Sequence, residues 1–386
     1  MISYGKQFID QDDIDAVTAA LKSDFITQGP IIKEFEDQLS KKVNSRYALA
    51  FNSATSALHV GCLSLGLGQN DILWTVPNSF VASANCALYC NAKIDFVDIN
   101  QDTYNVDIHE LEKKLKKAKI LNNLPKIFIP VHFSGQPTNQ EKIWKLSQEF
   151  GFKILEDASH SLGATRNDEP VGSCKWSDMA VLSFHAVKMI TTGEGGALVT
   201  SDNNLYTSAS SFRSHGVTRE RNLLIDQGQL PFYYEQQQLG FNYRITDIAS
   251  ALGISQLKKL KKFVETRQKI ASNYFSELSD TDLKLPTIEV ENKSSFHLFV
   301  VQFPKSILQK ISMKKVYHSL LADGINTNLH YYPIHLQPYY QALGFSRGDF
   351  PVAENYAESS LSIPMYVGLS ESDQAQVIDA LKKLYA

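Results

Sequence analysis

The sequence predicts an α/β fold in which a large domain with a mostly parallel sheet precedes a smaller α+β domain. Between residues 47 and 183, short apolar segments alternate with segments of helical periodicity, which is typical of parallel strands joined by helices. After Thr246 this alternation stops, and one long amphipathic segment runs to about residue 279. We therefore expect residues 1–260 to form the large domain and residues 261–386 the small one.

Two helices are expected before the first strand. Residues 12–22 carry apolar side chains at helical spacing, and acidic residues in the first turn suit the positive end of the helix dipole. The TQGP segment at residues 27–30 ends this helix, and a second helix is expected over residues 31–42.

The remaining elements follow from the alternation of apolar runs and helical periodicity. The strands expected in the large sheet are residues 47–51, 71–76, 94–97, 126–131, 153–156 and 179–183. The helices expected between them are residues 55–67, 79–90, 109–117 and 140–150. In the small domain we expect a strand at residues 296–303 and helices at residues 313–322 and 370–385.

Composition and charge exclude several classes of protein. The 386 residues carry 38 basic and 41 acidic side chains, so no global positive field favours nucleic acid. No apolar run approaches the ~18 residues of a membrane-spanning helix, and the N-terminus lacks the charged and apolar regions of a secretion signal. The four cysteines do not have the spacing of a metal site. We expect a cytoplasmic enzyme without bound metal, nucleic acid or membrane.

Small hydroxyl residues follow the first expected strand. Ser53, Ala54 and Thr55 begin the next helix, and ligands of parallel α/β sheets bind beyond the carboxyl ends of the strands. The first amides of a helix have no partner within the helix, and the dipole is positive there, so this position suits a phosphate group. An ordinary helix cap is the alternative interpretation.

An aromatic residue, a carboxylate and a lysine follow later strands. Phe80 suits stacking on a planar ring, or else a place in the core. Asp157 suits a contact with a pyridinium nitrogen, or else the capping of a loop. Apolar neighbours lower the pKa of Lys188 and favour a nucleophile, although a surface lysine is the alternative. The glycines of residues 193–196 permit tight turns beside a ligand.

Together these features supply the four parts of a pyridoxal phosphate site. A lysine holds the aldehyde carbon, and a carboxylate keeps the ring nitrogen protonated so that the ring acts as an electron sink. A helix N-terminus binds the phosphate, and an aromatic side chain covers the ring. None of these residues is specific alone, but they follow successive strands in chain order. We therefore predict pyridoxal 5′-phosphate as the cofactor.

Six segments of the chain resemble one known family. They are NSATSALH, EDASHSLGA, SFHAVKMITTGEGGALVT, FRSHG, LGFNYRITDIASALGISQL and NLHYYPIHLQPYY. In these segments the sequence resembles the DegT/DnrJ/EryC1/StrS family of pyridoxal-phosphate-dependent sugar aminotransferases, and the likeness covers nearly the whole chain. The resemblance implies the fold type I architecture of these aminotransferases.

The resemblance assigns roles around the cofactor. Lys188 is similar to the family's Schiff-base lysine and proton shuttle, and Asp157 matches the acidic partner of the pyridine nitrogen. His160 lies where the family has Gln or His near the phenolic oxygen of the cofactor. Phe80 lies at the ring-stacking position.

The resemblance also implies which residues bind the phosphate group of the cofactor. Ser183 and the backbone at Ala54 and Thr55 are similar to the family's phosphate-binding residues. Asn242 resembles the residue that reaches the phosphate from a second subunit. A homodimer with shared active sites is therefore implied.

Three further residues are expected to bind the substrate. Arg244 is near Asn242 and is a candidate for the nucleotide phosphates. His330 and Tyr331 lie where the family's small-domain loop approaches the sugar. Trp74 departs from the small or β-branched residue expected in its strand, and it either fills the core or crowds the site.

The resemblance implies a transamination in which L-glutamate gives its amino group to C4 of a nucleotide-linked 4-keto-6-deoxy sugar. The segments around Lys188 and residues 52–59 are most similar to the branch of the family that acts in pseudaminic acid biosynthesis. Its sugar is UDP-2-acetamido-2,6-dideoxy-β-L-arabino-hexos-4-ulose, and the bacillosamine-precursor, perosamine and 4-amino-arabinose types are the alternatives.

Other reactions fit the sequence less well. Family members that dehydrate a sugar at C3 carry His in place of the lysine, whereas this chain has Lys188. An NAD-dependent dehydrogenase would need a G-x-G-x-x-G turn after the first strand, and this sequence does not have one there. A non-catalytic pyridoxal phosphate sensor is a further alternative, but no DNA-binding extension or basic stretch accompanies the fold.

Overall fold

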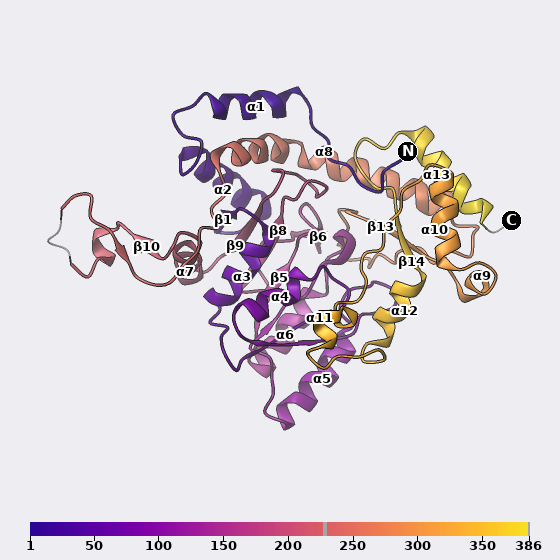
Figure 1. The fold of residues 1–386 in the computed structure, drawn as a ribbon, viewed down its shortest axis with the longest axis horizontal. Helices are drawn as coiled ribbons and strands as arrows, with labels where there is room; N and C mark the ends of the chain where they lie inside the picture. Colours follow the sequence, from indigo (N-terminus) through magenta and orange to yellow (C-terminus); the bar gives the residue numbers. More distant parts are fainter. Residues whose placement is uncertain (227–229, 385–386) are drawn as a thin grey trace.

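A seven-stranded sheet lies at the centre of the computed structural model, which describes residues 1–226 and 230–384 (Figure 1). The strand order is β1-β9-β8-β5-β4-β2-β3. The strands are β1 (Tyr47–Phe51), β2 (Ile72–Thr75), β3 (Lys93–Phe96), β4 (Ile127–Phe128), β5 (Lys153–Asp157), β8 (Met179–Ser183) and β9 (Gly196–Thr200). The predicted fold class is confirmed.

Strand β9 is antiparallel to both of its neighbours, β1 and β8, while the other pairs in the sheet are parallel. Because β1 and β8 both run opposite to β9, they run in the same direction as each other. The carboxyl ends of six strands therefore meet at one edge of the sheet. This edge is where the sequence places the candidate ligand-binding residues.

Helices cover both faces of the sheet. They are α2 (Pro30–Val43), α3 (Ala54–Ser64), α4 (Ala82–Tyr89), α5 (Ile108–Ile120), α6 (Gln140–Phe150), α7 (Asn203–Arg213) and α8 (Asp247–Glu277). Helix α1 (Gln11–Leu21) packs on the outside of α8 (Figure 1). Successive residues of a strand face opposite sides. Accordingly Met179 and Val181 pack in the core with α3 and α4, whereas Ala180 and Leu182 pack in the core with α2 and α8.

Most predicted elements of the large domain are present, with some differences at their ends. The expected strands at residues 47–51 and 179–183 and the helix at residues 140–150 have the predicted bounds. The strand predicted over residues 126–131 pairs only at Ile127–Phe128, because the chain then turns toward the short helix η1 (Phe133–Gly135). Strand β9 was not predicted.

The predicted start of one helix at residue 79 is wrong. Helix α4 begins at Ala82 because the preceding residues form a loop in which the Asn78 side chain accepts a hydrogen bond from the Tyr331 amide. This loop brings Phe80 to the edge of the sheet where the strands end.

A second body contains β13 (Phe299–Gln302) paired with β14 (Ser360–Ile363). Its core takes in α9 (Lys305–Leu308), α10 (Met313–Ala322) and α13 (Glu371–Lys383). Three helices of this part of the chain pack instead in the core of the large sheet, namely η3 (Ile334–Leu336), α11 (Pro338–Gln341) and α12 (Pro351–Ser359). The expected helix at residues 313–322 has the predicted bounds, and the last helix was predicted to end at residue 385, which lies outside the described residues.

Helix α8 connects the two bodies without a break. Leu260 and Phe263 pack with the large sheet, whereas Ile270 and Tyr274, further along the helix, pack in a separate core. Ile2 also packs in this second core, where it pairs with Ile325. The division of the chain at residue 260 stays a prediction.

Two small sheets and a short helix complete the fold. Strands β6 (Thr165–Arg166), β7 (Glu169–Pro170) and β12 (Asn292–Lys293) form a three-stranded sheet. The pair β10 (Val217–Thr218) and β11 (Glu235–Gln236), with the short helix η2 (Arg221–Leu223), belongs to an arm that projects from the body of the molecule (Figure 1). None of the helices in the described part of the chain combines the length and apolar character needed to cross a membrane.

Candidate active site

A cavity of about 570 Å³ lies at the carboxyl edge of the sheet. The strand ends, the beginning of α3 and the loop before η3 all contribute to its lining. Nine of the eleven residues selected from the sequence line this cavity, namely Ala54, Thr55, Phe80, Asp157, His160, Ser183, Lys188, His330 and Tyr331. The structure thus brings these residues together, while their individual roles stay predictions.

The start of α3 forms one end of the candidate site. The Ser53 hydroxyl accepts the amide hydrogen of Ser56 at 3.1 Å, and its carbonyl accepts that of Ala57. Ala54 and Thr55 line the cavity, and within residues 1–226 and 230–384 no hydrogen bond engages their amides, which are therefore available to a ligand. A phosphate fits there because the helix N-terminus carries a partial positive charge.

Gly196 allows β9 to lie directly against this helix start. A side-chain carbon at Gly196 would lie 2.4 Å from the Ala54 nitrogen and 2.7 Å from the Ser53 carbonyl carbon. Only glycine therefore permits this approach, which places the first turn of α3 over the end of the sheet.

Asp157 ends β5 and is 5% exposed. Its Oδ2 accepts a hydrogen bond from the Ser83 hydroxyl at 2.6 Å, and its Oδ1 accepts one from the Ser159 amide at 3.1 Å. Both oxygens are thus held in place by neighbouring donors. A carboxylate fixed in this way can hold a protonated ring nitrogen by a charge-assisted hydrogen bond.

Lys188 lies in the loop between β8 and β9, and its backbone amide donates to the His185 carbonyl. Burial lowers the pKa of the Lys188 amine from 10.5 to about 8, and the Asp157 carboxylate opposes part of this shift. A pKa of about 8 leaves a useful fraction of neutral amine near neutral pH. Lys188 can therefore act as a nucleophile toward an aldehyde and as a carrier of protons.

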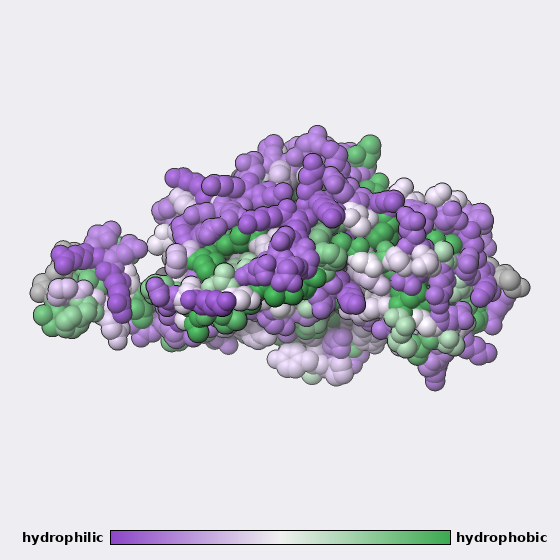
Figure 2. All heavy atoms as spheres, turned by 90° about the horizontal axis from the view of Figure 1, so that it is seen from above, coloured by the Kyte–Doolittle hydropathy of each residue, from purple (hydrophilic) through white to green (hydrophobic). Residues whose placement is uncertain are grey.

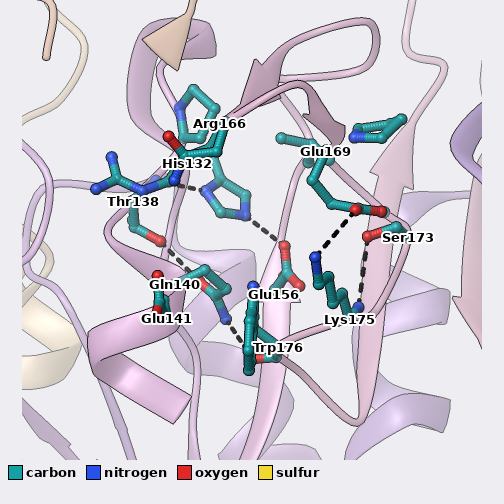
Figure 3. Close-up of a pocket in the computed structure, with 15 residues that line it drawn as sticks. His132, Thr138, Gln140, Glu141, Glu156, Arg166, Glu169, Ser173, Lys175 and Trp176 are labelled. Atoms are coloured by element: carbon teal, nitrogen blue, oxygen red, sulfur yellow. Dashed lines mark hydrogen bonds and ion pairs between the residues drawn. The ribbon is translucent and has the colours of Figure 1, made fainter. Parts of the chain in front are cut away.

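Beneath Asp157, the opposite face of the sheet holds a buried polar cluster (Figure 3). Glu156 precedes Asp157 in β5, so its side chain points to the other face. The carboxylate of Glu156 contacts His132 Nε2 at 2.6 Å and also accepts a hydrogen bond from the Ser177 hydroxyl. His132 Nδ1 accepts the Thr138 amide hydrogen at 2.9 Å. This cluster holds the end of β5, and with it Asp157.

His160 and Tyr331 meet inside the cavity. The Tyr331 hydroxyl lies 3.0 Å from His160 Nε2, and the Ser134 amide donates to His160 Nδ1 at 3.3 Å. Burial, with the nearby Lys188 amine, lowers the pKa of His160 well below its ordinary value. His160 is therefore neutral at physiological pH.

His330 is also held in one orientation. Its Nδ1 lies 2.8 Å from the Ser362 hydroxyl, and its Nε2 lies 3.4 Å from the Asn328 amide nitrogen. Burial lowers the pKa of His330 to about 3, and Lys188 contributes to the shift. His330 is therefore neutral at physiological pH and brings no positive charge to the cavity.

Phe80 is 59% exposed and lies at the cavity, with its ring centroid 6.3 Å from that of Tyr331. The alternative that Phe80 fills the core is therefore wrong. Trp74, in contrast, is 1% exposed and does not line the cavity; the Lys114 amine lies 4.9 Å from the centre of its ring. Trp74 fills core volume and does not crowd the site.

The structure does not bring Asn242 and Arg244 to this cavity. Arg244 lines a separate hollow with Gln28 and Lys33, and burial and the neighbouring Arg213 lower the pKa of its guanidinium. Asn242 pairs with Ser214 through the backbone. Within one chain, therefore, neither residue joins the other candidate residues.

Sequence reasoning missed several residues of the site, among them Ser83, His297 and Tyr4. Ser83 holds Asp157, while His297 and Tyr4 line the cavity, and the His297 ring centroid lies 4.4 Å from that of His160. Ser83 lies four residues after Ser79, and the two hydroxyls are 2.7 Å apart, so the spacing of these serines was an available signal. His297 and Tyr4 come from distant parts of the chain and gave no local signal.

The fold and the site define a pyridoxal-phosphate-dependent enzyme of the α/β aminotransferase type. The residues present fit the cofactor, because a lysine of lowered pKa, a buried carboxylate with both oxygens held, a helix N-terminus and an exposed aromatic ring share one cavity. The chain belongs to the DegT/DnrJ/EryC1/StrS aminotransferase family, whose model matches residues 7–382.

Relatives and solved structures agree with this family. The UDP-4-amino-4,6-dideoxy-N-acetyl-β-L-altrosamine transaminase of Campylobacter jejuni is 38% identical over 99% of this chain and 96% of its own length. Helicobacter pylori PseC, an aminotransferase involved in the biosynthesis of pseudaminic acid, superposes with a TM-score of 0.89 and 31% identity, over 100% of this chain and 99% of that one.

A third structure bears on the cofactor. The putative sugar aminotransferase Spr1654 of Streptococcus pneumoniae, in its PLP form, superposes with a TM-score of 0.88 and 25% identity, over 99% of this chain and 98% of that one. The chain is thus a pyridoxal-phosphate-dependent sugar aminotransferase, as the sequence predicted.

Proposed function

We propose that the protein transfers an amino group from L-glutamate to C4 of UDP-2-acetamido-2,6-dideoxy-β-L-arabino-hexos-4-ulose, as a step of pseudaminic acid biosynthesis. The observation that carries this proposal is the full-length similarity to the Campylobacter jejuni transaminase, combined with the presence of Lys188 and Asp157 in one cavity. The cytoplasmic location expected from the sequence stays a prediction.

Each site residue has a part in the proposed reaction. When bound, pyridoxal phosphate supplies an electron sink that stabilises negative charge at the carbon that loses a proton. Asp157 holds the ring nitrogen in its protonated form, the amides of Ala54 and Thr55 with Ser183 bind the phosphate, and Phe80 covers the ring.

Lys188 carries the protons. Its neutral amine holds the cofactor and, once released, removes the proton from Cα of the amino donor and returns a proton to C4 of the sugar. The pKa of about 8 suits both directions, because the amine accepts and gives up a proton at similar cost near neutral pH. His330 and Tyr331 bind the sugar beside it.

The proposal is tested with the purified protein loaded with pyridoxal phosphate. We expect L-glutamate to bleach the visible band, and the UDP-linked 4-keto sugar to restore it with formation of the 4-amino sugar, detected by mass spectrometry. A protein whose band does not respond to glutamate would exclude this donor.

A panel of substrates separates the sugar alternatives. The keto sugars that precede bacillosamine, perosamine and 4-amino-arabinose are compared by kcat/KM with the altrosamine precursor. If one of them is preferred by tenfold or more, the pseudaminic acid assignment is wrong while the transaminase chemistry stands.

We also propose that the active enzyme is a homodimer in which Asn242 and Arg244 serve the partner's site. In support, neither residue lines the cavity of its own chain. The arm that carries β10 and β11 exposes Ile225, Phe232 and Leu239 by 88%, 71% and 80%, and Figure 2 shows hydrophobic surface on this arm. Exposed apolar groups of this kind suit a protein partner.

Subunit complementation tests the shared site. We expect Lys188→Ala and Asn242→Ala homodimers to lose turnover, and a mixed dimer to regain it, because one of its two sites then has both wild-type residues. If Asn242 acted within its own chain, no site of the mixed dimer would be intact, and turnover would stay absent.

A further inference from the structure

His160 lies between two hydrogen-bonding partners that come from different parts of the chain. On one side, the backbone amide of Ser134 donates to Nδ1 at 3.3 Å. On the other side, the Tyr331 hydroxyl lies 3.0 Å from Nε2. The Ser134 amide can only donate, and this restriction fixes the direction of each hydrogen bond from Ser134 through His160 to Tyr331.

The ring of His160 carries its proton on Nε2. Burial lowers the pKa of His160 well below its ordinary value, so the imidazole is neutral and has one N–H group. Nδ1 accepts the Ser134 amide hydrogen and is therefore not protonated. The remaining nitrogen, Nε2, must bear the hydrogen and donate it to the oxygen of Tyr331.

Tyr331 consequently keeps its own hydroxyl hydrogen for another acceptor. Burial and the nearby Asp157 carboxylate raise the pKa of the Tyr331 hydroxyl, so it stays protonated. Within the described part of the chain, His160 is the one group that shares a hydrogen bond with this hydroxyl. Because Tyr331 lines the cavity, its free hydrogen is available to a ligand there.

Further hydrogen bonds fix Ser134 and Tyr331, the residues on either side of His160. The Ser134 hydroxyl donates to the Leu298 carbonyl at 2.7 Å, which fixes the turn that presents the Ser134 amide. The Tyr331 amide donates to Asn78 Oδ1 at 3.0 Å. The polarity is therefore set before any ligand binds.

We infer that His160 is a positioning residue that makes the Tyr331 hydroxyl a hydrogen-bond donor toward an acceptor oxygen of the bound ligand. The inference rests on the proposed function, since two such oxygens enter the cavity: the phenolic oxygen of the cofactor and an oxygen of the keto sugar.

Other titratable groups lie around His160 and Tyr331, and the substitutions proposed below for this pair leave all of them in place. Asp157 at the end of β5 acts on Tyr331, and Lys188 in the loop after β8 acts on His160. His330 also acts on His160, and Tyr4 acts on Tyr331. His297 packs on the His160 ring.

The first experiment titrates the visible absorption of the cofactor-loaded protein with pH, in the absence of sugar. A donor to the cofactor's phenolic oxygen stabilises the ionised form of that oxygen, so removing the donor raises the pKa of the chromophore. We expect Tyr331→Phe to raise it by about one unit, a tenfold change. Tyr332→Phe is the matched control, because Tyr332 is 46% exposed and does not line the cavity.

The second experiment measures the affinity of the same variants for the UDP-linked sugar product by calorimetry. If Tyr331 donates to the sugar, Tyr331→Phe weakens binding by about tenfold while the chromophore pKa stays at the wild-type value. A change in either experiment supports the inference and identifies the oxygen. If neither quantity changes, Tyr331 is not a donor to the ligand and the inference is overturned.

Variants of His160 test whether it acts through Tyr331. Glutamine accepts with its oxygen and donates with its nitrogen, so His160→Gln keeps the direction of both hydrogen bonds. We expect this variant to keep the wild-type chromophore pKa and the wild-type affinity for the sugar product. His160→Leu removes the donor and should reproduce the Tyr331→Phe change. In a Tyr331→Phe background, His160→Leu should have no further effect; a full additional effect would contradict the positioning role.

These outcomes are separable from the proposed function. If the wild-type protein forms the visible band and transaminates while Tyr331→Phe matches it in both experiments, the function stands and the inference fails. If His160→Leu does not fold, Tyr331→Phe still decides, because it removes a single oxygen atom.

Discussion

The hydroxyl of Ser83 donates a hydrogen bond of 2.6 Å to Oδ2 of Asp157, and this contact joins α4 to the end of β5. Both groups are buried, and the second carboxylate oxygen is held by the Ser159 amide. Two donors therefore keep the carboxylate in one orientation before the cofactor binds. Such orientation matters because a charge-assisted hydrogen bond to a ring nitrogen depends on direction as well as distance.

We predict that Ser83→Ala weakens the affinity for pyridoxal phosphate by roughly tenfold, because a hydrogen bond to a charged group contributes ~1.5–3 kcal/mol. The affinity is measured by absorbance titration of the cofactor-free protein. Ser64→Ala is the control, since the Ser64 hydroxyl is buried and has no hydrogen-bond partner within the described part of the chain. Equal affinities for both variants would show that Ser83 does not orient Asp157.

The pKa of Lys188 gives a prediction about pH. Burial lowers this pKa from 10.5 to about 8, so the neutral, nucleophilic form of the amine grows as pH rises through 8. We expect the rate at which the cofactor-free protein takes up pyridoxal phosphate covalently to rise up to about pH 8 and then to level off. Stopped-flow absorbance measures this rate.

The direction in which Asp157 shifts the pKa of Lys188 provides a check on the predicted pH profile. The carboxylate raises the pKa of Lys188, against the larger effect of burial. Asp157→Asn removes that attraction, so the midpoint of the pH profile should move below 8. A rate that keeps rising tenfold per pH unit to pH 10 would mean that Lys188 behaves as an exposed lysine.

Much of the fold was predictable because the hydrophobic periodicity of each segment agrees with its place in the alternation of strands and helices. Strand β9 was missed, since GALVT follows a glycine-rich loop and has no helix before it, so the alternation gave no reason to expect it. Its antiparallel direction agrees with the connection over residues 184–195, which contains no helix, because a crossover between parallel neighbours usually contains one. The predicted strand at residues 126–131 was too long, because an apolar run does not show where pairing stops.

The candidate site was predictable where residues follow strand ends in sequence order. Asp157 and Lys188 end or follow β5 and β8, and these neighbouring strands bring them together. His297 and Tyr4 join the same cavity through packing of the second body, which no local pattern encodes. Arg244 lies outside the cavity, because its segment pairs with Phe51 on the far side of β1 from β9.

The buried cluster beneath Asp157 leads to a prediction about stability. Glu156→Leu leaves the His132 and Ser177 donors without their acceptor in a buried place, and we expect a loss of about 2–4 kcal/mol in the free energy of unfolding. Denaturant unfolding of the cofactor-free protein measures it. Glu141→Leu is the control: its side chain is 43% exposed, so removing its ion pair with Lys145 should change stability by less than ~1 kcal/mol.

The approach of Gly196 to α3 gives the sharpest test of the phosphate position. In Gly196→Ala the added carbon would lie 2.4 Å from the Ala54 nitrogen, so the first turn of α3 must move away from the sheet. We expect a loss of roughly 1–3 kcal/mol in stability, as for other overpacked sites. The affinity for pyridoxal phosphate should fall by more than that for free pyridoxal, because the displaced amides belong to the phosphate end of the site.

Gly68→Ala is the matched control, since an added carbon there meets no atom within 4 Å. This variant should keep wild-type affinity for both compounds, and its stability should equal or slightly exceed that of the wild type, because alanine restricts the unfolded chain. Comparing the phosphorylated and unphosphorylated cofactor separates a local effect on phosphate binding from general damage. If Gly196→Ala weakened both compounds equally, the start of α3 would not be the phosphate site.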